Sequence, residues 1–489
     1  MTTAAYPWID GDFISGHGPT LDVVSPSTEE LIATVTTPNA AEFDQAVRSA
    51  WEAHRDGRWR RLPALERQRV LMAVGELLRQ ADETLSQTIA SEMGMPSGAA
   101  RFIEVPYAAA AFEFFAGTIP SIHGRTLPVD VPGAPPEYLA MTLKEPVGVA
   151  GLITPWNFPL MLPSWKLAAA LAAGCTAVLK PAPESPLSAL ALGPLLQEAG
   201  VPDGVVNIVP GGDALGEALV DDPRITKISF TGETASGRRV LQSAGATIKR
   251  VSVELGGKSP MIIFDDVDLD EAVSQSLFGT FFNAGQVCQA TTRILVQSTI
   301  YEQFLDRFRS RASALRVGNA LDPAVDVGPV ISKKRMEVMD ALVHEAVAVG
   351  ARLVIGGHPL KGPGFYYAPT ILADARMDMR VCQQEIFGPV AAVRPFANEQ
   401  EATAMANDSK YGLAAAIMTR DVARAMRLAR DVECGTIWVN TVHVLTPTAP
   451  FGGMKASGLG RELGLDGLSE YLETKTVIVD LNHQPMTYF

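Results

Sequence analysis

The chain has 489 residues, of which 47% are hydrophobic and 19% are charged. This length suits about three domains or lobes, and the composition excludes a disordered protein because it can bury a large core. A formal net charge of −13 argues against nucleic acid or an anionic membrane as the partner, since both favour a basic surface.

The cysteines indicate the compartment. Four of them, at positions 175, 288, 382 and 434, show no CxxC or Cys/His spacing, so the sequence predicts neither a disulfide framework nor a metal site. The N-terminal residues lack the basic and apolar regions of a signal peptide. The most apolar run, residues 167–179, is too short to span a bilayer. We therefore expect a protein of the reducing cytoplasm.

In chain order, the first 40 residues have the pattern of short strands and turns. Residues 40–116 are predicted to be helical because apolar residues recur at spacings of three and four. The Pro- and Gly-rich passage 124–146 contains period-two segments and predicts an arm or hairpin. The tail TKTVIVDL (474–481) is too isolated to fold alone, so we expect it to pair with this arm or with another subunit.

Between residues 147 and 255, short apolar strands alternate with helices. Such alternation with short connections predicts an α/β fold with a doubly wound parallel sheet and ligands at the carboxyl ends of its strands. A second alternating region follows, with helices expected at 268–283, 300–316 and 333–350. The sequence therefore predicts two Rossmann-like domains, 1–123 with 147–255 and then 256–456, and a small β arm made of 124–146 and 471–489.

Cys288 lies in a turn that contains Gly, Gln and Asn between apolar runs. A lone cysteine is most often a small buried hydrophobe. A nucleophilic thiolate needs access, a base and a cradle for the charge that it creates. The rest of the chain decides between these two interpretations.

Five separated stretches bear on that choice: TPWNFP (154–159), ELGGKSP (254–260), GQVC (285–288), QEIFGPV (384–390) and PFGGMKASGLGRE (450–462). Together, and in this order, they resemble the NAD(P)-dependent aldehyde dehydrogenase superfamily, and the resemblance covers nearly the full chain. It implies that the first domain binds the dinucleotide, that the second is catalytic and that the arm joins subunits into a homodimer or homotetramer.

The resemblance implies that Cys288 attacks the aldehyde carbon to give a thiohemiacetal, that hydride leaves for the nicotinamide and that water cleaves the resulting thioester. Glu254 matches the general base, and its place at the end of an apolar strand predicts a raised pKa. Asn157 matches the oxyanion donor, acting with the backbone N–H of Cys288. The alternative for Glu254 is a strand-end acid that caps a turn, and the alternative for Asn157 is an asparagine that suits the geometry of a turn.

No GxGxxG fingerprint follows a strand, and the family's strand–Gly–helix turn matches residues 230–237, whose backbone amides would face the pyrophosphate. We expect Glu233, where serine is common, to turn outward and cap the helix. Pro183 stands where many NAD-preferring relatives have glutamate, and Glu184, if it takes that role, favours NAD over NADP. The predicted cofactor residues are Thr154, Pro155, Trp156, Lys180, Glu184, Gly212, Phe230, Thr231, Gly232, Glu233, Gly237, Leu255, Gly256, Glu385 and Phe387.

The substrate pocket is inferred from position. It comprises Phe114, Leu162, Trp165, Phe282, Val287, Gln289, His443, Leu445 and Phe451. These residues are mostly apolar and none is arginine, which favours an uncharged aromatic or aliphatic aldehyde over a semialdehyde acid. His443 could bind a substrate hydroxyl or could be a wall residue bonded to backbone.

Three questions stay open at this point. Lys166 and Glu462 match a pair that some relatives are thought to use for proton exit, and a surface salt bridge is the alternative. A CoA-acylating dehydrogenase is a second possible activity, although Glu254 argues against it because that route needs no water-activating base. A non-catalytic scaffold of the same fold is a third hypothesis, and the presence together of Cys288, Glu254 and Asn157 argues against it.

Overall fold

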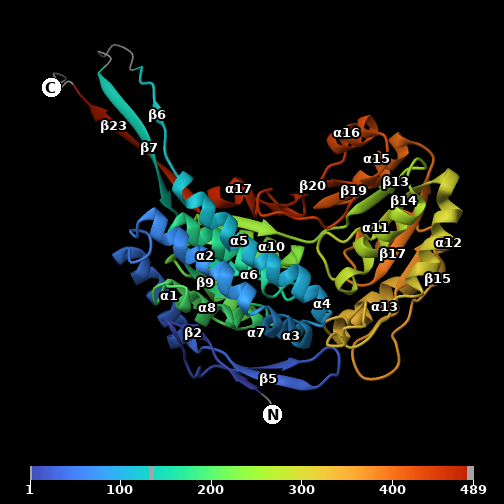
Figure 1. The fold of residues 1–489 in the computed structure, drawn as a ribbon, viewed down its shortest axis with the longest axis horizontal. Coiled ribbons are helices and arrows are strands. Elements are labelled where there is room, and N and C mark those ends of the chain that lie inside the picture. Colours follow the sequence, from blue (N-terminus) through green and yellow to red (C-terminus); the bar gives the residue numbers. More distant parts are fainter. Residues whose placement is uncertain (1–2, 131–136, 482–489) are drawn as a thin grey trace.

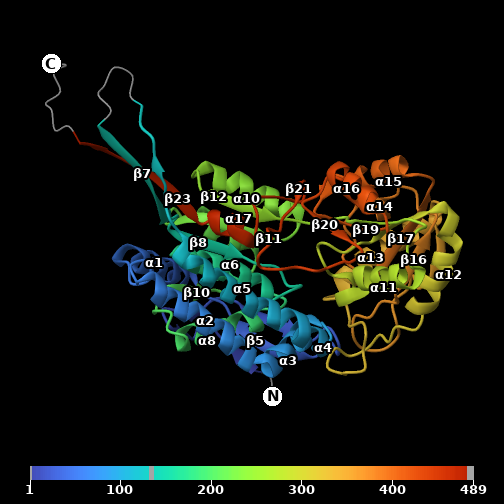
Figure 2. The ribbon, with the colours of Figure 1, turned by 45° about the horizontal axis from the view of Figure 1, so that its top comes forward.

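The computed structural model describes residues 3–130 and 137–481. These form two large sheets, each covered by helices, and a three-stranded ribbon that projects away from the first sheet (Figure 1). Both views place the two sheets in separate bodies side by side (Figures 1 and 2). The predicted α/β class with two parallel, helix-covered sheets is confirmed.

The first sheet has the strand order β22-β12-β11-β8-β9-β10-β2-β3. Its five central strands are parallel: β8 (Val149–Ile153), β9 (Thr176–Lys180), β10 (Val206–Ile208), β11 (Ile225–Thr231) and β12 (Arg250–Glu254). The antiparallel edges are β2 (Trp8–Ile9), β3 (Asp12–Phe13) and β22 (Gly458–Leu459). From β8 the chain adds β9 and β10 on one side and then β11 and β12 on the other side of β8. Such a switch point between β8 and β11 opens a crevice at the carboxyl ends of the strands.

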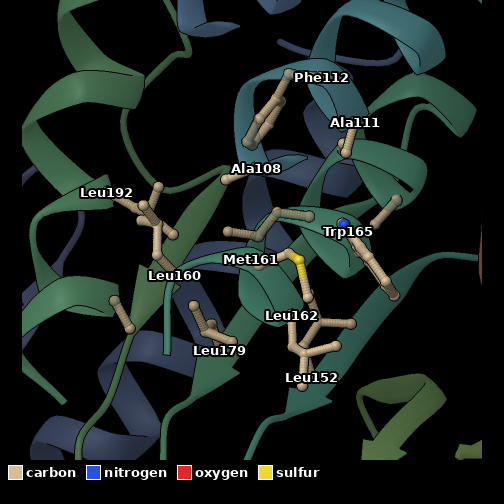
Figure 3. Packing of buried hydrophobic residues seen from close by; sticks show 14 of the residues in the cluster. Ala108, Ala111, Phe112, Leu152, Leu160, Met161, Leu162, Trp165, Leu179 and Leu192 are labelled. Carbon is tan, nitrogen blue, oxygen red and sulfur yellow. The ribbon is translucent and has the colours of Figure 1, made fainter. Parts of the chain in front are cut away.

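Helices cover both faces of this sheet and give it two cores. One face packs against α2 (Ala64–Gln80), α5 (Val105–Thr118) and α6 (Met161–Ala173), and the other against α1 (Ala40–Asp56), α9 (Asp213–Asp221) and α10 (Thr234–Ala246). Figure 3 shows the first core, in which Leu152 and Leu179 of the strands lie near Leu162 of α6, while Phe112 of α5 lies farther from the sheet. Alternate strand residues serve opposite faces, as the pleat requires.

One helical run, Ser97–Ser121, is long and apolar enough to cross a membrane, and it is the one such run within residues 3–130 and 137–481. Its main part, α5, packs between α2 and α6 in the core of the first body. The apolar character of this run is therefore explained by burial inside the protein.

The second sheet has the order β15-β16-β17-β14-β13-β19-β20 and is parallel except for β15. Its strands are β13 (Pro260–Ile263), β14 (Arg293–Gln297), β15 (Arg352–Ile355), β16 (Thr370–Ala373), β17 (Val390–Phe396), β19 (Ala414–Met418) and β20 (Thr436–Val439). The expected helices are present as α11 (Leu269–Phe281), α12 (Tyr301–Ala312) and α13 (Lys333–Ala348), and α15 (Glu399–Asn407) and α16 (Val422–Asp431) complete the cover. The Asp268 side chain caps α11 and sets its start.

The projecting ribbon consists of β6 (Thr126–Leu127), β7 (Tyr138–Pro146) and β23 (Leu472–Asp480). β23 pairs antiparallel with β7 along its whole length, so the tail pairs with the arm of its own chain. Residues 131–136 and 482–489 of the predicted arm lie outside the described residues. Residues 457–470, which the predicted division assigns to no domain, contribute β22 to the first sheet.

Candidate active site

The turn that carries Cys288 follows α11 and is held in an uncommon backbone conformation. Asn283, Ala284 and Gly285 have φ values of 51°, 52° and 70°. Left-handed backbone at two non-glycine residues persists only where the surroundings hold it. Gln286 supplies that hold: its side-chain amide donates to the Asn283 and Pro329 carbonyls at 3.2 and 3.3 Å and accepts from the Ile331 N–H at 2.8 Å. Cys288 is thereby presented from a fixed turn.

Cys288 is partly buried, whereas the other three cysteines are buried, and all four are free thiols. Burial raises the pKa of the Cys288 thiol well above its usual range, and the nearby Glu254 and Glu385 carboxylates raise it further. A thiol in this state needs a base beside it before it can act as a nucleophile.

The neighbouring carboxylate is Glu254, at the carboxyl end of β12 beside Thr231 of β11. Both of its carboxylate oxygens are buried, and a hydrogen bond with the Cys288 side chain acts on its pKa. Burial raises the pKa of Glu254 well above its usual range, the Glu462 carboxylate raises it further, and Lys166 opposes these effects. The predicted direction of the shift is confirmed.

The two glycines after Glu254 allow the bodies to meet. A Cβ on Gly256 would lie 2.2 Å from Oε2 of Glu385, and a Cβ on Gly257 would lie 2.3 Å from the carbonyl oxygen of Cys288. No side chain fits at such distances. The two glycines therefore allow the segment that follows Glu254 to approach Glu385 and Cys288 of the second body closely.

Asn157 is joined to the Cys288 turn by two hydrogen bonds. Its side-chain amide donates to the Gln286 carbonyl at 3.0 Å, and the Asn283 amide donates to the Asn157 carbonyl at 3.1 Å. An amide nitrogen carries two hydrogens, so one remains to donate elsewhere. Asn157 is thus held in position and keeps a donor, as an oxyanion site requires.

Lys166 of α6 and Glu462 form a buried ion pair, with the Lys166 side chain fully covered and that of Glu462 10% exposed. The Lys166 ammonium also donates to Ser229 Oγ at 2.9 Å. The alternative of a surface salt bridge is therefore wrong. Because Glu462 and Lys166 both act on the pKa of Glu254, this pair lies within electrostatic reach of the base.

A cavity of about 740 Å³ lies at the carboxyl ends of the first sheet and reaches Asn157, Glu254 and Cys288. All predicted cofactor residues border it except Gly212 and Gly237. Gly212 precedes α9, and Gly237 packs closely on Leu255, where a Cβ would lie 2.3 Å from that side chain. Sequence reasoning missed Asp213, Arg335, Lys410 and Tyr411, which also border the cavity and belong to none of the recognised motifs.

Charged side chains border the part of the cavity around Lys180, where the sequence predicts the adenosine end of the cofactor. Burial lowers the pKa of Lys180 to about 8, while Glu184 and Asp213 oppose that shift. Glu184 is exposed on the cavity wall. Glu233 occupies the N-cap position of α10 and is exposed, but its side chain makes no capping hydrogen bond, so the expected cap is absent.

The other end of the cavity approaches Cys288 and contains Glu385 and Phe387. Glu385 accepts a hydrogen bond from the Gly257 N–H at 3.1 Å, and burial raises its pKa to about 7. The Phe387 ring meets Trp156 edge to face, with centroids 5.2 Å apart. These residues line the cavity together with Cys288.

Most of the predicted substrate residues belong to the first core or pack against it, as Cys288 itself does. Leu162, Trp165, Val287 and Phe451 are buried in the first core, and Trp165 packs edge to face on Phe451 with centroids 6.0 Å apart. The partly buried members of this set pack against the same core and are Phe114, Phe282 and Leu445. Among the predicted substrate residues, Leu162 alone also borders the cofactor cavity.

Gln289 and His443 add the polar contacts of this set. The Gln289 side-chain nitrogen lies 3.2 Å from Nδ1 of His443, whose Nε2 lies 3.3 Å from the Gly279 carbonyl oxygen. His443 is therefore bonded at both ring nitrogens, and the wall-residue alternative describes it better than a free substrate ligand.

Comparison with known proteins agrees with this geometry. The profile of the Aldehyde dehydrogenase family matches residues 13–477. Human retinal dehydrogenase 2 is 42% identical over 470 residues, which are 96% of this chain and 90% of that protein. A betaine aldehyde dehydrogenase from Cereibacter sphaeroides is 40% identical over 479 residues, which are 98% of each.

Solved structures give the same result. An aldehyde dehydrogenase from Bacillus cereus aligns with a TM-score of 0.95 at 38% identity, covering 98% of this chain and 97% of that one. Betaine aldehyde dehydrogenase from Staphylococcus aureus in complex with NAD+ also aligns with a TM-score of 0.95, at 35% identity, covering 99% of this chain and 96% of that one.

The chain belongs to the aldehyde dehydrogenase family, and it is an oxidoreductase that acts on aldehydes with NAD(P). Its own residues fit that cofactor. The buried hydroxyls of Thr154 and Thr231 on the cavity wall find no hydrogen-bond partner among the described residues. Such unpaired groups suit a polar ligand.

Proposed function

We propose that the protein oxidises an uncharged aromatic or aliphatic aldehyde to its carboxylic acid through a covalent intermediate on Cys288. The observation that carries this proposal is the meeting of Cys288, Glu254 and Asn157 at the inner end of the cofactor cavity. The apolar residues on the other side of the thiol support the choice of an uncharged substrate, since a charged group would lose its hydration there.

In the first half-reaction, Glu254 accepts the thiol proton of Cys288, and the thiolate bonds to the aldehyde carbon. The carbonyl electron pair moves onto oxygen, where the free amide hydrogen of Asn157 and the backbone N–H of Cys288 stabilise the negative charge. NAD(P)+, when bound, accepts the hydride that leaves this carbon. Cys288 then holds the product as a thioester.

In the second half-reaction, Glu254 removes a proton from water, whose oxygen bonds to the thioester carbon. The carbon–sulfur bond then breaks, and the acid leaves while Cys288 returns to the thiolate. The raised pKa of Glu254 suits a base that works near neutral pH. We assign the buried Lys166–Glu462 pair to carry the proton away from Glu254, because it lies within electrostatic reach of that carboxylate.

The residues at the adenosine end bear on the choice of cofactor. Lys180 would bind the ribose, and the exposed carboxylate of Glu184 on the same wall favours NAD over NADP because it repels a 2′-phosphate. The amides at the start of α10 would face the pyrophosphate, with Glu233 turned outward.

We further propose a homodimer or homotetramer joined through the ribbon. Leu143, Ile478 and Val479 expose apolar side chains on it, and Ile478 is 63% exposed. A projecting two-sided strand pair gains stability when another subunit covers it. The free thiols at three buried cysteines support a location in the reducing cytoplasm.

The test measures formation of reduced nicotinamide by absorbance, with purified protein, NAD or NADP, and aldehydes that vary in length and charge. Turnover of uncharged aldehydes with NAD, independent of CoA, is the expected result. A requirement for CoA would replace hydrolysis by acyl transfer, and cofactor binding without turnover of any aldehyde would contradict the proposed oxidation.

A further inference from the structure

The substrate side of Cys288 contains one polar side-chain pair among apolar residues. Gln289 directly follows the nucleophile and is 4% exposed, and its side-chain nitrogen lies 3.2 Å from Nδ1 of His443. The His443 ring is surrounded by Phe278, Phe282 and Trp438, whose ring centroids lie 5.4, 6.0 and 5.9 Å away. A polar pair in such surroundings is costly unless every group is bonded.

The hydrogen-bond roles in this pair follow from the Gly279 carbonyl. A carbonyl only accepts, so Nε2 of His443 carries the hydrogen in the 3.3 Å contact. Burial lowers the pKa of His443 to about 4, so the ring is neutral and its Nδ1 is a bare acceptor. Gln289 must therefore present its NH₂ group to Nδ1, which turns its carbonyl oxygen Oε1 the other way.

That oxygen has no partner. Gln289 Oε1 is buried, and no described residue donates a hydrogen bond to it. Turning the amide over would bring Oε1 against the bare Nδ1 of His443 and lose the existing bond. His443 is itself held in left-handed backbone, with φ of 59°, between the Gly279 and Gln289 contacts. The unpaired acceptor is thus held in one orientation, on the residue that directly follows Cys288.

We propose that Gln289 is a specificity-determining residue whose Oε1 accepts a hydrogen bond from a hydroxyl group on the substrate, and that His443 is the residue that positions it. The substrates are then phenolic or hydroxyalkyl aldehydes. The inference rests on the proposed oxidation of uncharged aldehydes and names their chemical class. A substrate hydroxyl would satisfy the buried oxygen, whereas a methyl group of similar size would leave it unpaired.

Other donors fit this pocket less well. A carboxylate has no hydrogen to donate near neutral pH, and it would meet the carbonyl oxygen of Gln289 as a second acceptor. A protonated amine can donate, but none of the residues assigned to the pocket carries a negative charge to balance it. An uncharged hydroxyl meets both conditions.

The test compares matched aldehydes. The ortho, meta and para hydroxybenzaldehydes are each paired with the corresponding methylbenzaldehyde, and 6-hydroxyhexanal is paired with heptanal. We expect kcat/KM of the native protein to favour the hydroxyl member by at least about tenfold in one or more pairs. In Gln289→Met, which keeps the length of the side chain and removes its acceptor, that ratio should fall to about one.

A second variant separates the positioning role. His443→Phe keeps an aromatic ring against Phe282 but removes the acceptor that orients Gln289. The ratio of kcat/KM between the hydroxyl and methyl members of each pair should fall toward one in this variant. A residue that served only to pack would change both members of each pair equally.

The possible results separate the role of Gln289 from the proposed oxidation of aldehydes. Equal kcat/KM for every hydroxyl and methyl pair in the native protein, with turnover of both, would overturn the role of Gln289 and leave aldehyde oxidation intact. An unchanged hydroxyl preference in Gln289→Met would overturn it as well. Absence of turnover with all of these aldehydes would instead contradict the proposed function.

Discussion

The two sides of the Cys288 turn differ in character. The cofactor side is an open cavity of about 740 Å³ lined by Lys180, Glu184, Asp213 and other charged groups. The substrate side is packed into the first core, with apolar and aromatic side chains and the Gln289–His443 pair. Cys288 therefore lies between a cavity bordered by charged side chains and a packed cluster of apolar ones.

This difference indicates which residues contribute to cofactor binding and which contribute to selectivity among aldehydes. In the open cavity, each charged contact competes with water and is screened, so several contacts must share the work of binding a cofactor. On the packed side, a single polar contact has few competitors, and its loss leaves a buried group unpaired. Substitutions on the two sides should therefore separate cofactor affinity from aldehyde selectivity.

The largest effect should come from Cys288→Ser, which removes the nucleophile that both sides share. We expect kcat to fall by at least about 10⁴-fold, because a serine hydroxyl is a far weaker nucleophile than a thiolate. Cofactor affinity, measured by calorimetry, should change little. Cys434→Ser, at a buried cysteine bonded to the Thr436 carbonyl, is the matched control and should keep near-native turnover. Near-native turnover in Cys288→Ser itself would refute the covalent scheme.

Glu254→Gln should slow thioester hydrolysis by about 10²–10⁴-fold, since general-base catalysis is lost. If the thiolate forms by another route in this variant, a rapid burst of reduced nicotinamide will precede the slow steady rate in stopped-flow absorbance. In the native protein the hydrolysis rate should rise with pH through the raised pKa of Glu254, because only the ionised carboxylate is a base. A pH-independent hydrolysis rate between acid and neutral pH would contradict this role.

Asn157→Ala should lower kcat by about 10²–10³-fold, the usual effect of removing one oxyanion donor. The aldehyde KM should change less, because the donor stabilises charge that develops during the reaction. Because Asn157 also bonds the Gln286 carbonyl, thermal unfolding should be measured beside the kinetics. If kcat falls as expected but the variant is unfolded or markedly less stable, the role of Asn157 is structural instead.

Lys180→Met tests the cofactor side by itself. The dissociation constant for NAD should rise by about tenfold, as expected for a lost charge-assisted hydrogen bond, while the relative rates among aldehydes stay the same. The native affinity should fall as pH rises through about 8, because Lys180 then loses its charge. That pH dependence should be absent in the variant, and its persistence would assign it to another group.

The smallest effect should come from Trp165→Phe on the substrate side. The shorter ring leaves a gap against Phe451, so KM for aromatic aldehydes should rise by a few fold through lost contact. NAD affinity should be unchanged. A larger change in NAD affinity than in aldehyde KM would show that the two sides are not independent.

Much of the fold and of the catalytic set follows from the sequence. Strand–helix alternation between residues 147 and 255 predicted the first sheet, and the raised pKa of Glu254 followed from an acid at the end of an apolar strand. These features depend on local pattern, and a period of two or 3.6 residues is visible in any window of the chain. The predicted cofactor residues came instead from the resemblance to the family, matched residue by residue.

The tertiary structure decided what depends on segments far apart in sequence. It buried the Lys166–Glu462 pair, left Glu233 without a capping bond and placed Arg335 and Tyr411 on the cavity wall. It also bonded His443 at both ring nitrogens and thereby turned the acceptor of Gln289 away from it. Residue types and their spacing specify which groups can bond, but only the packed chain fixes which partner each one finds, because every partner taken leaves another group unpaired.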